Sequence, residues 1–383
     1  MTGVDDTGET VTGAAAPGER RPPASRIVEL PGAFRTWCGD TVPGVRVAYE
    51  SWGEPAGDGS NTLVVFTGLS PSAHAASCER DPSPGWWEAM IGPGRALDTN
   101  RFHVLCFNSL GSCFGSTGPA SLRPDGEGPW QVDFPELRIE DMATAAALAL
   151  DEFGYSRVHG IVGPSMGGMT ALAFLLRHPG RARHLLSISS AVGAAPFAIA
   201  VRSLQREIVR YDPQWQEGRY PPEQPPVGGM RMARKLGMAS YRSPQEWAQR
   251  FGREKVEKPD PGFGPRFQIE SYLAAHADKF VGGFDPNCYL YLSRAMDLFD
   301  VADHGQDRDE AMARLHYLES ACVLGVESDI LFPLEQQKAL ARGLEGAGVG
   351  TEFHALPCIQ GHDAFLADTD SFAPVVADYL RRI

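Results

Sequence analysis

The residues with the clearest chemical potential in this 383-residue chain are a serine and two glycines near it. Gly163 and Gly167 flank Ser165 in a G-x-S-x-G pattern, after an apolar run and before the helical sequence TALAFLL. On so sharp a strand-to-helix turn the serine backbone is strained, and only small residues fit two positions before and after it. The turn exposes the hydroxyl beside a helix N-terminus, which stabilises negative charge. The pattern predicts a nucleophile; the simpler interpretation is a Gly-rich turn whose serine caps the helix.

A serine nucleophile needs a base and an acid that orients the base, and we expect the chain order serine, acid, histidine. Asp329 follows the apolar run CVLGV and lies out in the next loop, whereas its rival Glu327 comes directly after that run. Capping the following helix is the simpler role for Asp329. Among ten histidines, His362 best fits the base because it follows a predicted strand at 353–356 and precedes the last helix. Order and context therefore select Ser165, Asp329 and His362.

The negative charge that develops on an attacked carbonyl oxygen needs two backbone donors. One is the residue after the nucleophile, Met166, and the other comes from the loop after an earlier strand. The sequence TGLS at 67–70 follows the apolar run LVVF and predicts that loop. We therefore expect the N–H groups of Met166 and Leu69 to form the oxyanion hole.

The elements that must position these residues alternate between strand-like and helix-like patterns, which predicts an α/β fold with a mostly parallel sheet covered on both faces. Continuous apolar runs such as LVVF are typical of central strands in such a sheet. The predicted helices are Ile139–Phe153 and Met169–Arg177. The predicted strands are Val45–Tyr49, Thr62–Phe66, Phe102–Phe107, Val158–Val162, Leu185–Ser189 and Cys322–Val326.

One long segment, 196–315, breaks this alternation. It is rich in Arg, Gln, Tyr and Trp and predicts several helices joined by Pro- and Gly-rich loops. We interpret it as a helical lid inserted into an α/β core formed by residues 25–195 and 316–383. Residues 1–24 are rich in small and acidic residues and have no apolar segment typical of a secretory signal, so we expect a disordered tail.

The overall composition excludes several classes of function. The formal net charge is -13, so the chain has no excess positive charge for general binding to nucleic acids or anionic membranes. No run of 18 apolar residues predicts a membrane span. Seven cysteines at scattered spacings predict free thiols in a reducing cytoplasm and neither a disulfide framework nor a metal site.

Four longer motifs carry a resemblance to a known family. They are NSLGSCFGSTGPAS (108–121), PGWWEAMIGPGRALDTNRFHV (84–104), GPSMGGM (163–169) and GHDAFL (361–366). The chain from Pro23 onwards resembles the homoserine O-acetyltransferase family of CoA-dependent amino-acid O-acyltransferases. The resemblance implies an α/β-hydrolase fold, a lid that also forms a homodimer, and acyl-CoA as co-substrate with no bound cofactor. It further implies a ping-pong mechanism, in which Ser165 takes the acyl group and passes it to an amino-acid hydroxyl.

The same resemblance implies roles for two binding residues. Arg234 matches the arginine that holds the carboxylate of the amino acid, a bidentate task that suits a guanidinium. Asp363, beside His362, matches the residue that holds the ammonium group. Their simpler roles are a surface charge on the lid and a helix N-cap.

The acceptor and the donor depend on the branch of the family. Segments 67–77, 196–210, 241–254 and 284–300 most resemble the serine O-succinyltransferase and serine O-acetyltransferase branch, with Pro71 as a shared mark. Serine is one methylene shorter than homoserine, and a stiff wall at Pro71 would hold its hydroxyl near the nucleophile. One methylene gives only about 1–3 kcal/mol of discrimination, so we expect some reaction with homoserine.

The acyl donor is less constrained. Homoserine succinyltransferases of this family carry an arginine two residues after the catalytic aspartate, where this chain has Leu331. Arg202 and Arg206, spaced i and i+4 on a predicted lid helix, could anchor a succinyl carboxylate instead, although an exposed basic face is the simpler role for at least one. We expect succinyl-CoA, with acetyl-CoA as the alternative, and a product used for cysteine or related amino-acid synthesis. The rival functions are homoserine O-acetyltransferase, esterase or thioesterase, and an inactive binding scaffold.

Overall fold

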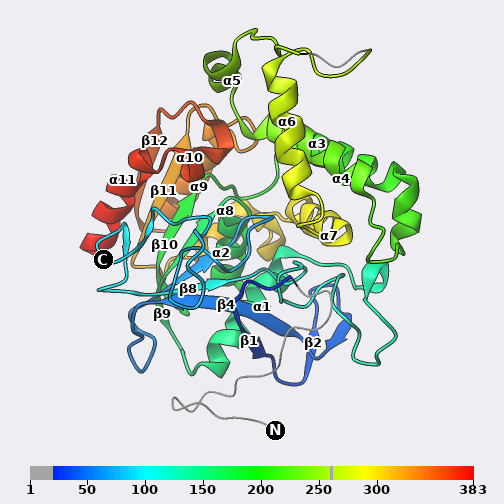
Figure 1. The fold of residues 1–383 in the computed structure, drawn as a ribbon. Helices are drawn as coiled ribbons and strands as arrows, with labels where there is room; N and C mark the ends of the chain where they lie inside the picture. The colour runs from blue at the N-terminus through cyan, green and yellow to red at the C-terminus, as the bar shows by residue number, and fades with distance from the viewer. Residues whose placement is uncertain (1–19, 259–261) are drawn as a thin grey trace.

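A mostly parallel eight-stranded sheet forms the centre of the computed structural model, which describes residues 20–258 and 262–383 (Figure 1). Residues 1–19 of the predicted tail lie outside the described part. The sheet order is β1-β4-β8-β5-β9-β10-β11-β12, in which only β1–β4 and β4–β8 are antiparallel neighbours. Its strands are β1 (Arg26–Glu29), β4 (Arg46–Trp52), β5 (Thr62–Phe66), β8 (His103–Phe107), β9 (Val158–Pro164), β10 (Ala182–Ile188), β11 (Ser320–Val326) and β12 (Gly350–Leu356).

Each face of the sheet carries its own hydrophobic core. In β5, Val64 and Phe66 point into one core, whereas Leu63 and Val65 point into the other. Helices α1 (Ile139–Glu152), α2 (Met166–Arg177) and α9 (Leu334–Gly346) cover the first face. Helix α11 (Thr369–Arg382) and part of the segment 75–104 cover the second. Burial on both faces explains the continuous apolar runs, and the predicted fold class is confirmed.

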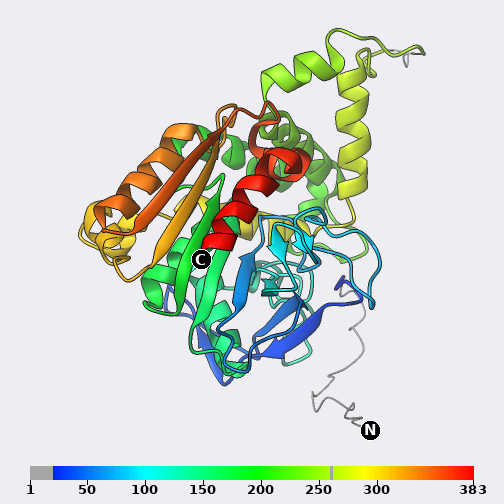
Figure 2. The same cartoon turned by 90° about the vertical axis from the view of Figure 1, so that its left-hand side faces the viewer.

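A helical segment leaves the core after β10 and returns before β11. Strands β10 and β11 are nevertheless neighbours in the sheet, although this insertion separates them in sequence. Helices α5 and α6 stand away from the sheet, and α7 lies between the other lid helices and the core (Figures 1 and 2). The last two elements, η3 and α8, pack against α2 and α9. The inserted elements are α3 (Pro196–Tyr211), η2 (Pro213–Gly218), α4 (Val227–Tyr241), α5 (Pro244–Phe251), α6 (Gln268–Phe280), α7 (Pro286–Leu298), η3 (Val301–His304) and α8 (Arg308–Ala313).

The remaining elements are short. Two two-stranded ribbons pair β2 (Ala33–Arg35) with β3 (Thr41–Pro43) and β6 (Ile91–Gly92) with β7 (Leu97–Asp98). The helical turns η1 (Gln131–Asp133), η4 (Gly361–Asp363) and α10 (Ala364–Ala367) complete the described structure. In that part of the chain, no helix combines the length and the apolar character needed to cross a bilayer.

Candidate active site

The turn between β9 and α2 holds Ser165 in a strained conformation, with φ 55° and ψ −123°. The flanking positions must be glycine because a side chain there would collide with nearby backbone. A Cβ atom on Gly163 would lie 2.3 Å from the Gly167 carbonyl oxygen. A Cβ atom on Gly167 would lie 2.2 Å from the carbonyl oxygen of Phe66. The Ser165 side chain makes no capping hydrogen bond to α2, so the simpler interpretation of the motif is wrong. The backbone stores strain at this serine, as at many functional sites.

Three predicted residues form one buried chain of hydrogen bonds. His362 Nε2 lies 2.8 Å from Ser165 Oγ, and His362 Nδ1 lies 2.7 Å from Asp329 Oδ2. The other carboxylate oxygen of Asp329 accepts hydrogen bonds of 2.9 Å from the backbone N–H groups of Leu331 and Phe332. The aspartate is therefore fixed, and it orients the imidazole so that Nδ1–H faces the carboxylate and Nε2 accepts from the serine hydroxyl. This arrangement can activate a serine for nucleophilic attack.

The protonation of His362 is set by opposing effects. Burial lowers its pKa, but the charge and hydrogen bond of Asp329, helped by the nearby charge of Asp363, outweigh burial and raise the pKa above its ordinary value. The positive charge of Arg202 opposes that rise. The ring also stacks on Phe332, with centroids 4.8 Å apart. The site therefore favours the imidazolium that forms when the base accepts a proton.

The loop after β5 lies beside the nucleophile turn. Leu69 is half-buried against the core, and Met166 is fully buried at the first position of α2, where helix N–H groups lack intrahelical partners. Asn108 approaches the Pro71 carbonyl oxygen from the end of β8, with its Nδ2 at 3.5 Å. The Thr67 side chain forms a hydrogen bond with Ser109. The structure thus anchors the predicted oxyanion loop from β8.

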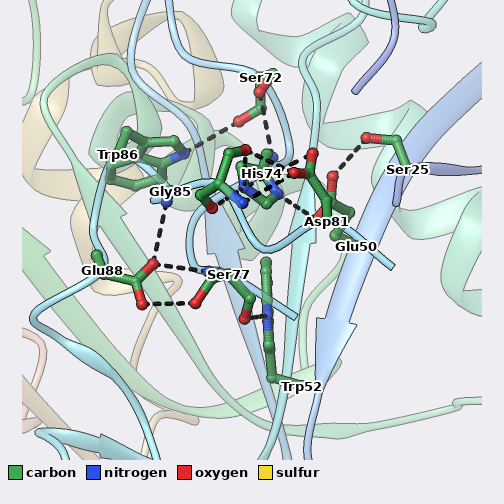
Figure 3. A network of polar contacts seen from close by, with 11 residues as sticks. Ser25, Glu50, Trp52, Ser72, His74, Ser77, Asp81, Gly85, Trp86 and Glu88 are labelled. Carbon is green, nitrogen blue, oxygen red and sulfur yellow. Dashed lines mark hydrogen bonds and ion pairs between the residues drawn. The ribbon is translucent and has the colours of Figure 1, made fainter. Parts of the chain in front are cut away.

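A second anchor of this loop is a buried network around His74, which the sequence motifs did not reveal (Figure 3). His74 Nδ1 lies 2.9 Å from Glu50 Oε2, and its Nε2 lies 2.8 Å from the carbonyl oxygen of Ser83. Both partners only accept hydrogen bonds, so both contacts are satisfied only by the imidazolium form. Asp81 lies 3.9 Å from Nε2, and Ser25 donates to Glu50. The network therefore ties the loop to β4 and to the segment before β1.

Two tryptophans fix the far end of the same loop. Trp86 Nε1 donates to the carbonyl oxygen of Ser72 at 3.0 Å. Trp87 Nε1 donates to the carbonyl oxygen of Phe365 at 3.1 Å, three residues after His362. The loop that carries Leu69 is thus joined to the segment that carries the base.

Arg234 lies on α4 of the lid, where its guanidinium is close to two aromatic rings. Its guanidinium stacks over the Phe280 ring at 4.4 Å and lies 5.8 Å from the centre of the Tyr241 ring. The Tyr241 ring is in turn 6.4 Å from the ring of His362. Arg234 Nε is buried and has no hydrogen-bond partner among the described residues. Sequence reasoning missed Tyr241 because nothing in its context separates it from other aromatic residues of the lid.

Asp363 is already paired. Its Oδ2 lies 3.1 Å from Nε of Arg242, which also binds Glu246 at 2.8 Å. The Asp363 side chain makes no capping bond to α10. Arg242, which sequence reasoning missed, therefore fixes the position of this carboxylate at the junction of α4 and the histidine loop.

The two arginines on α3 do not form an exposed basic face, so that simpler interpretation is wrong. Arg202 is 6% exposed, and its Nε lies 2.5 Å from Asp297 Oδ1. Arg206 Nη1 lies 2.7 Å from the other oxygen of Asp297 and donates to Ser293 at 2.9 Å. Helix α7, which carries Asp297, packs over this face of α3, so that Arg202 is buried and the Arg206 side chain is 18% exposed. Leu331 is 4% exposed and packs in the core.

Comparison with known proteins agrees with this architecture. The family model described as alpha/beta hydrolase fold matches residues 61–357, so the chain belongs to that family. The serine O-succinyltransferase of Litchfieldella anticariensis is 54% identical over 362 residues, which cover 94% of this chain and 99% of that protein. The L-serine/homoserine O-acetyltransferase of Streptomyces lavendulae is 52% identical over 366 residues, which cover 94% of this chain and 98% of that protein.

A solved esterase structure is 26% identical, with a TM-score of 0.84, and covers 93% of this chain and 99% of that one. Within the α/β-hydrolase fold, the chain belongs with its relatives to the homoserine O-acetyltransferase family. It is an acyltransferase.

Proposed function

We propose that the protein transfers an acyl group from acyl-CoA to the hydroxyl of L-serine through an acyl-Ser165 intermediate. The observation that carries this proposal is the buried hydrogen-bonded chain of Ser165, His362 and Asp329, which we assign as the catalytic triad. The names of the two relatives support serine as the acceptor.

In the first half-reaction, Ser165 Oγ attacks the thioester carbonyl while His362 Nε2 takes the hydroxyl proton. The N–H groups of Met166 and Leu69 stabilise the tetrahedral oxyanion. The C–S bond then breaks, and His362 gives its proton to the departing CoA thiolate. Asp329 stabilises the imidazolium that forms.

In the second half-reaction, His362 takes the proton of the amino-acid hydroxyl, which attacks the acyl carbonyl. The ester bond to Ser165 breaks, and the proton returns to its Oγ. Arg234 holds the carboxylate of the acceptor and Asp363 holds its ammonium group, while Pro71 limits the depth of the acceptor site. The product is an O-acylserine, whose activated side chain suits replacement by a sulfur nucleophile in cysteine or related synthesis, and we assign the reaction to the cytoplasm.

Transfer competes with hydrolysis, because water can also attack the acyl-enzyme. The lid supports transfer, since it limits the access of water to the nucleophile. Esterase activity is the second candidate because the solved esterase shares the fold. Homoserine O-acetyltransferase activity is the third, since one relative is named for both acceptors.

Thiol release from succinyl-CoA and acetyl-CoA, each with L-serine, L-homoserine or no acceptor, tests the proposal. We expect fast release with serine and slower release with homoserine. Equal release with and without an acceptor would make the protein a hydrolase. Faster release with homoserine would assign it to the homoserine acetyltransferase group.

We also propose that the lid forms a homodimer. Phe197, Leu204 and Tyr211 are 51%, 51% and 83% exposed, and they follow one face of α3 at intervals of about two helical turns. Exposed apolar residues gathered on one face are typical of an interface. Light scattering of the wild type should give the mass of a dimer, and Leu204→Glu should shift it toward the monomer. A monomeric wild type would contradict this proposal.

A further inference from the structure

The arginine pair on α3 has too little negative charge around it. Arg202 and Arg206 share the carboxylate of Asp297, whose side chain is 7% exposed. In the described part of the chain, no other carboxylate is in ion-pair contact with either arginine. Two guanidiniums and one carboxylate leave an excess positive charge in a place with little access to water. Buried charges are normally paired, so the cluster lacks one anion.

The missing anion has a defined position, because the two arginines differ. Arg206 is held by both Asp297 and Ser293. Arg202 binds Asp297 through Nε, whereas its Nη2 is buried without a hydrogen-bond partner among the described residues. A buried charged donor without a partner is costly, and native structures keep such groups mainly for a purpose. Arg202 therefore offers a free donor for a ligand.

The free donor lies on a helix that packs beside the helix of the proposed acceptor residue. The positive charge of Arg202 also acts on the pKa of His362, on which burial and Asp329 act more strongly. On the neighbouring residue, Gln205 Nε2 donates to the Ala233 carbonyl oxygen, so α3 packs directly beside the part of α4 that carries Arg234. The cluster and the proposed acceptor residue Arg234 thus lie on α3 and α4, two lid helices that pack against each other.

We infer that Arg202 Nη2 binds the distal carboxylate of a dicarboxylic acyl group, so that the preferred donor is succinyl-CoA. This inference rests on the proposed acyltransferase function. A guanidinium suits the task because its planar fork presents donors to two carboxylates at once: Nε is used by Asp297 and Nη2 remains for the ligand. Asp297 is a positioning residue, since it holds the fork without touching the donor.

The assignment gives each substrate carboxylate its own arginine. Arg234 serves the carboxylate of the acceptor and Arg202 that of the acyl group. The distal carboxylate takes no part in bond breaking, so it remains ionised and bound to Arg202 in both half-reactions. An acetyl group has no such carboxylate and would leave Nη2 unpaired. Arg202 on α3 would thus do the task of the arginine that is absent at position 331.

Arg202→Met tests the inference with two donors of equal carbon number. Succinyl-CoA carries the distal carboxylate, and butyryl-CoA replaces it with a methyl group. For the wild type, we expect kcat/KM to favour succinyl-CoA by about 100-fold or more, because loss of one partner from a buried charge pair is costly. In Arg202→Met this preference should disappear. Arg206 still neutralises Asp297 in the variant, so the fold should be retained, which circular dichroism checks.

Two further variants serve as controls. Arg202→Lys keeps the charge but loses the fork, and we expect it to recover only part of the preference. Arg210→Met removes an exposed arginine from the same helix, and its donor preference should equal that of the wild type. Asp297→Asn should weaken the preference less than Arg202→Met, because the guanidinium remains but is held less firmly.

An unchanged ratio of succinyl to butyryl transfer in Arg202→Met would overturn the inference. So would a variant in which only the KM for serine rises, since Arg202 would then serve the acceptor. Failure of the proposed function itself looks different: the wild type would form no acyl-enzyme with any acyl-CoA, as intact-mass spectrometry would show.

Discussion

The His74 network of the core and the arginine cluster of the lid are both buried and polar, and they differ in how completely they are paired. In the His74 network of the core, each ring nitrogen has an acceptor, and Glu50 is bound by both His74 and Ser25. In the arginine cluster of the lid, Arg202 has a buried donor without a partner. The first cluster is complete within the protein, whereas the second is not.

This difference separates a structural task from a binding task. A fully paired buried network stabilises one geometry, and here it fixes the loop that carries Leu69. An incompletely paired cluster costs stability in the free protein and recovers that cost when a ligand supplies the missing group. Removing a member should therefore damage the fold in the first cluster and substrate selection in the second.

Loss of the candidate nucleophile should have the largest effect on activity, and it tests the site that both clusters are proposed to serve. Ser165→Ala should lower kcat by about 10⁴-fold or more, because the candidate triad loses its nucleophile. Intact-mass spectrometry after incubation with acyl-CoA should detect no acyl-enzyme. Turnover close to that of the wild type would remove Ser165, and with it both clusters, from the mechanism.

The next effect compares stability between the clusters. His74→Gln leaves Glu50 buried with an incomplete partner set, and breaking such a pair should lower the free energy of unfolding by about 3 kcal/mol. Arg202→Met should lower it by less, about 1 kcal/mol, because the Nε bond to Asp297 is lost but Asp297 keeps Arg206 and the unpaired Nη2 is removed. Urea unfolding of both variants measures the difference. Equal losses of stability would contradict the distinction between the clusters.

Arg234 should behave like the lid cluster, because its Nε also lacks a partner. Arg234→Ala should raise the KM for serine by about 30-fold, which corresponds to about 2 kcal/mol, with a smaller effect on acyl-enzyme formation. Steady-state kinetics with varied serine, together with the acylation rate, separates the two steps. Unchanged acceptor kinetics would remove Arg234 from the acceptor site.

The smallest effect is a dependence of stability on pH. Burial lowers the pKa of His74, but the hydrogen bonds to Glu50 and Ser83 and the charges of Glu50 and Asp81 raise it above its ordinary value. Burial, together with the charge of Glu50, raises the pKa of the neighbouring Cys106 thiol on β8 well above its ordinary value, so this thiol stays neutral. The stabilisation by His74 is therefore complete below the ordinary histidine pKa of about 6.5 and is lost as the pH rises through the raised value.

The difference in melting temperature between wild type and His74→Gln should consequently shrink as the pH increases. Activity should at first increase with pH, because His362 must lose its proton to act as a base and its pKa is also raised. A constant difference in melting temperature from pH 6 to pH 9 would show that His74 does not act as an imidazolium.

The sequence predicted the parts of the molecule that are governed by local patterns. Buried strands such as β5 have unbroken apolar runs, and their bounds were found to within a few residues. The G-x-S-x-G motif predicted the strained turn because its glycines are demanded by contacts close in sequence and by Phe66. The edge strand β1 was missed because it has four residues and only one of them is buried.

The two clusters depend on long-range packing, which local patterns do not encode. The spacing of Arg202 and Arg206 indicates a shared helix face, but their partner Asp297 lies far along the chain on α7. The His74 network similarly joins a loop without a motif to Glu50 on β4. Helical periodicity predicts which residues share a face, and only the tertiary structure shows what covers that face.

The position of the lid in the chain also sets the order in which the candidate triad residues are synthesised during translation. Ser165 precedes the inserted helices, whereas Asp329 and His362 follow them, so a ribosome makes the nucleophile long before the acid and base. A nascent chain that has already formed β9 and α2 carries a serine without general-base assistance. Under the proposed mechanism, reactivity toward thioesters therefore begins only when β11, β12 and the histidine loop have been synthesised and have joined the sheet.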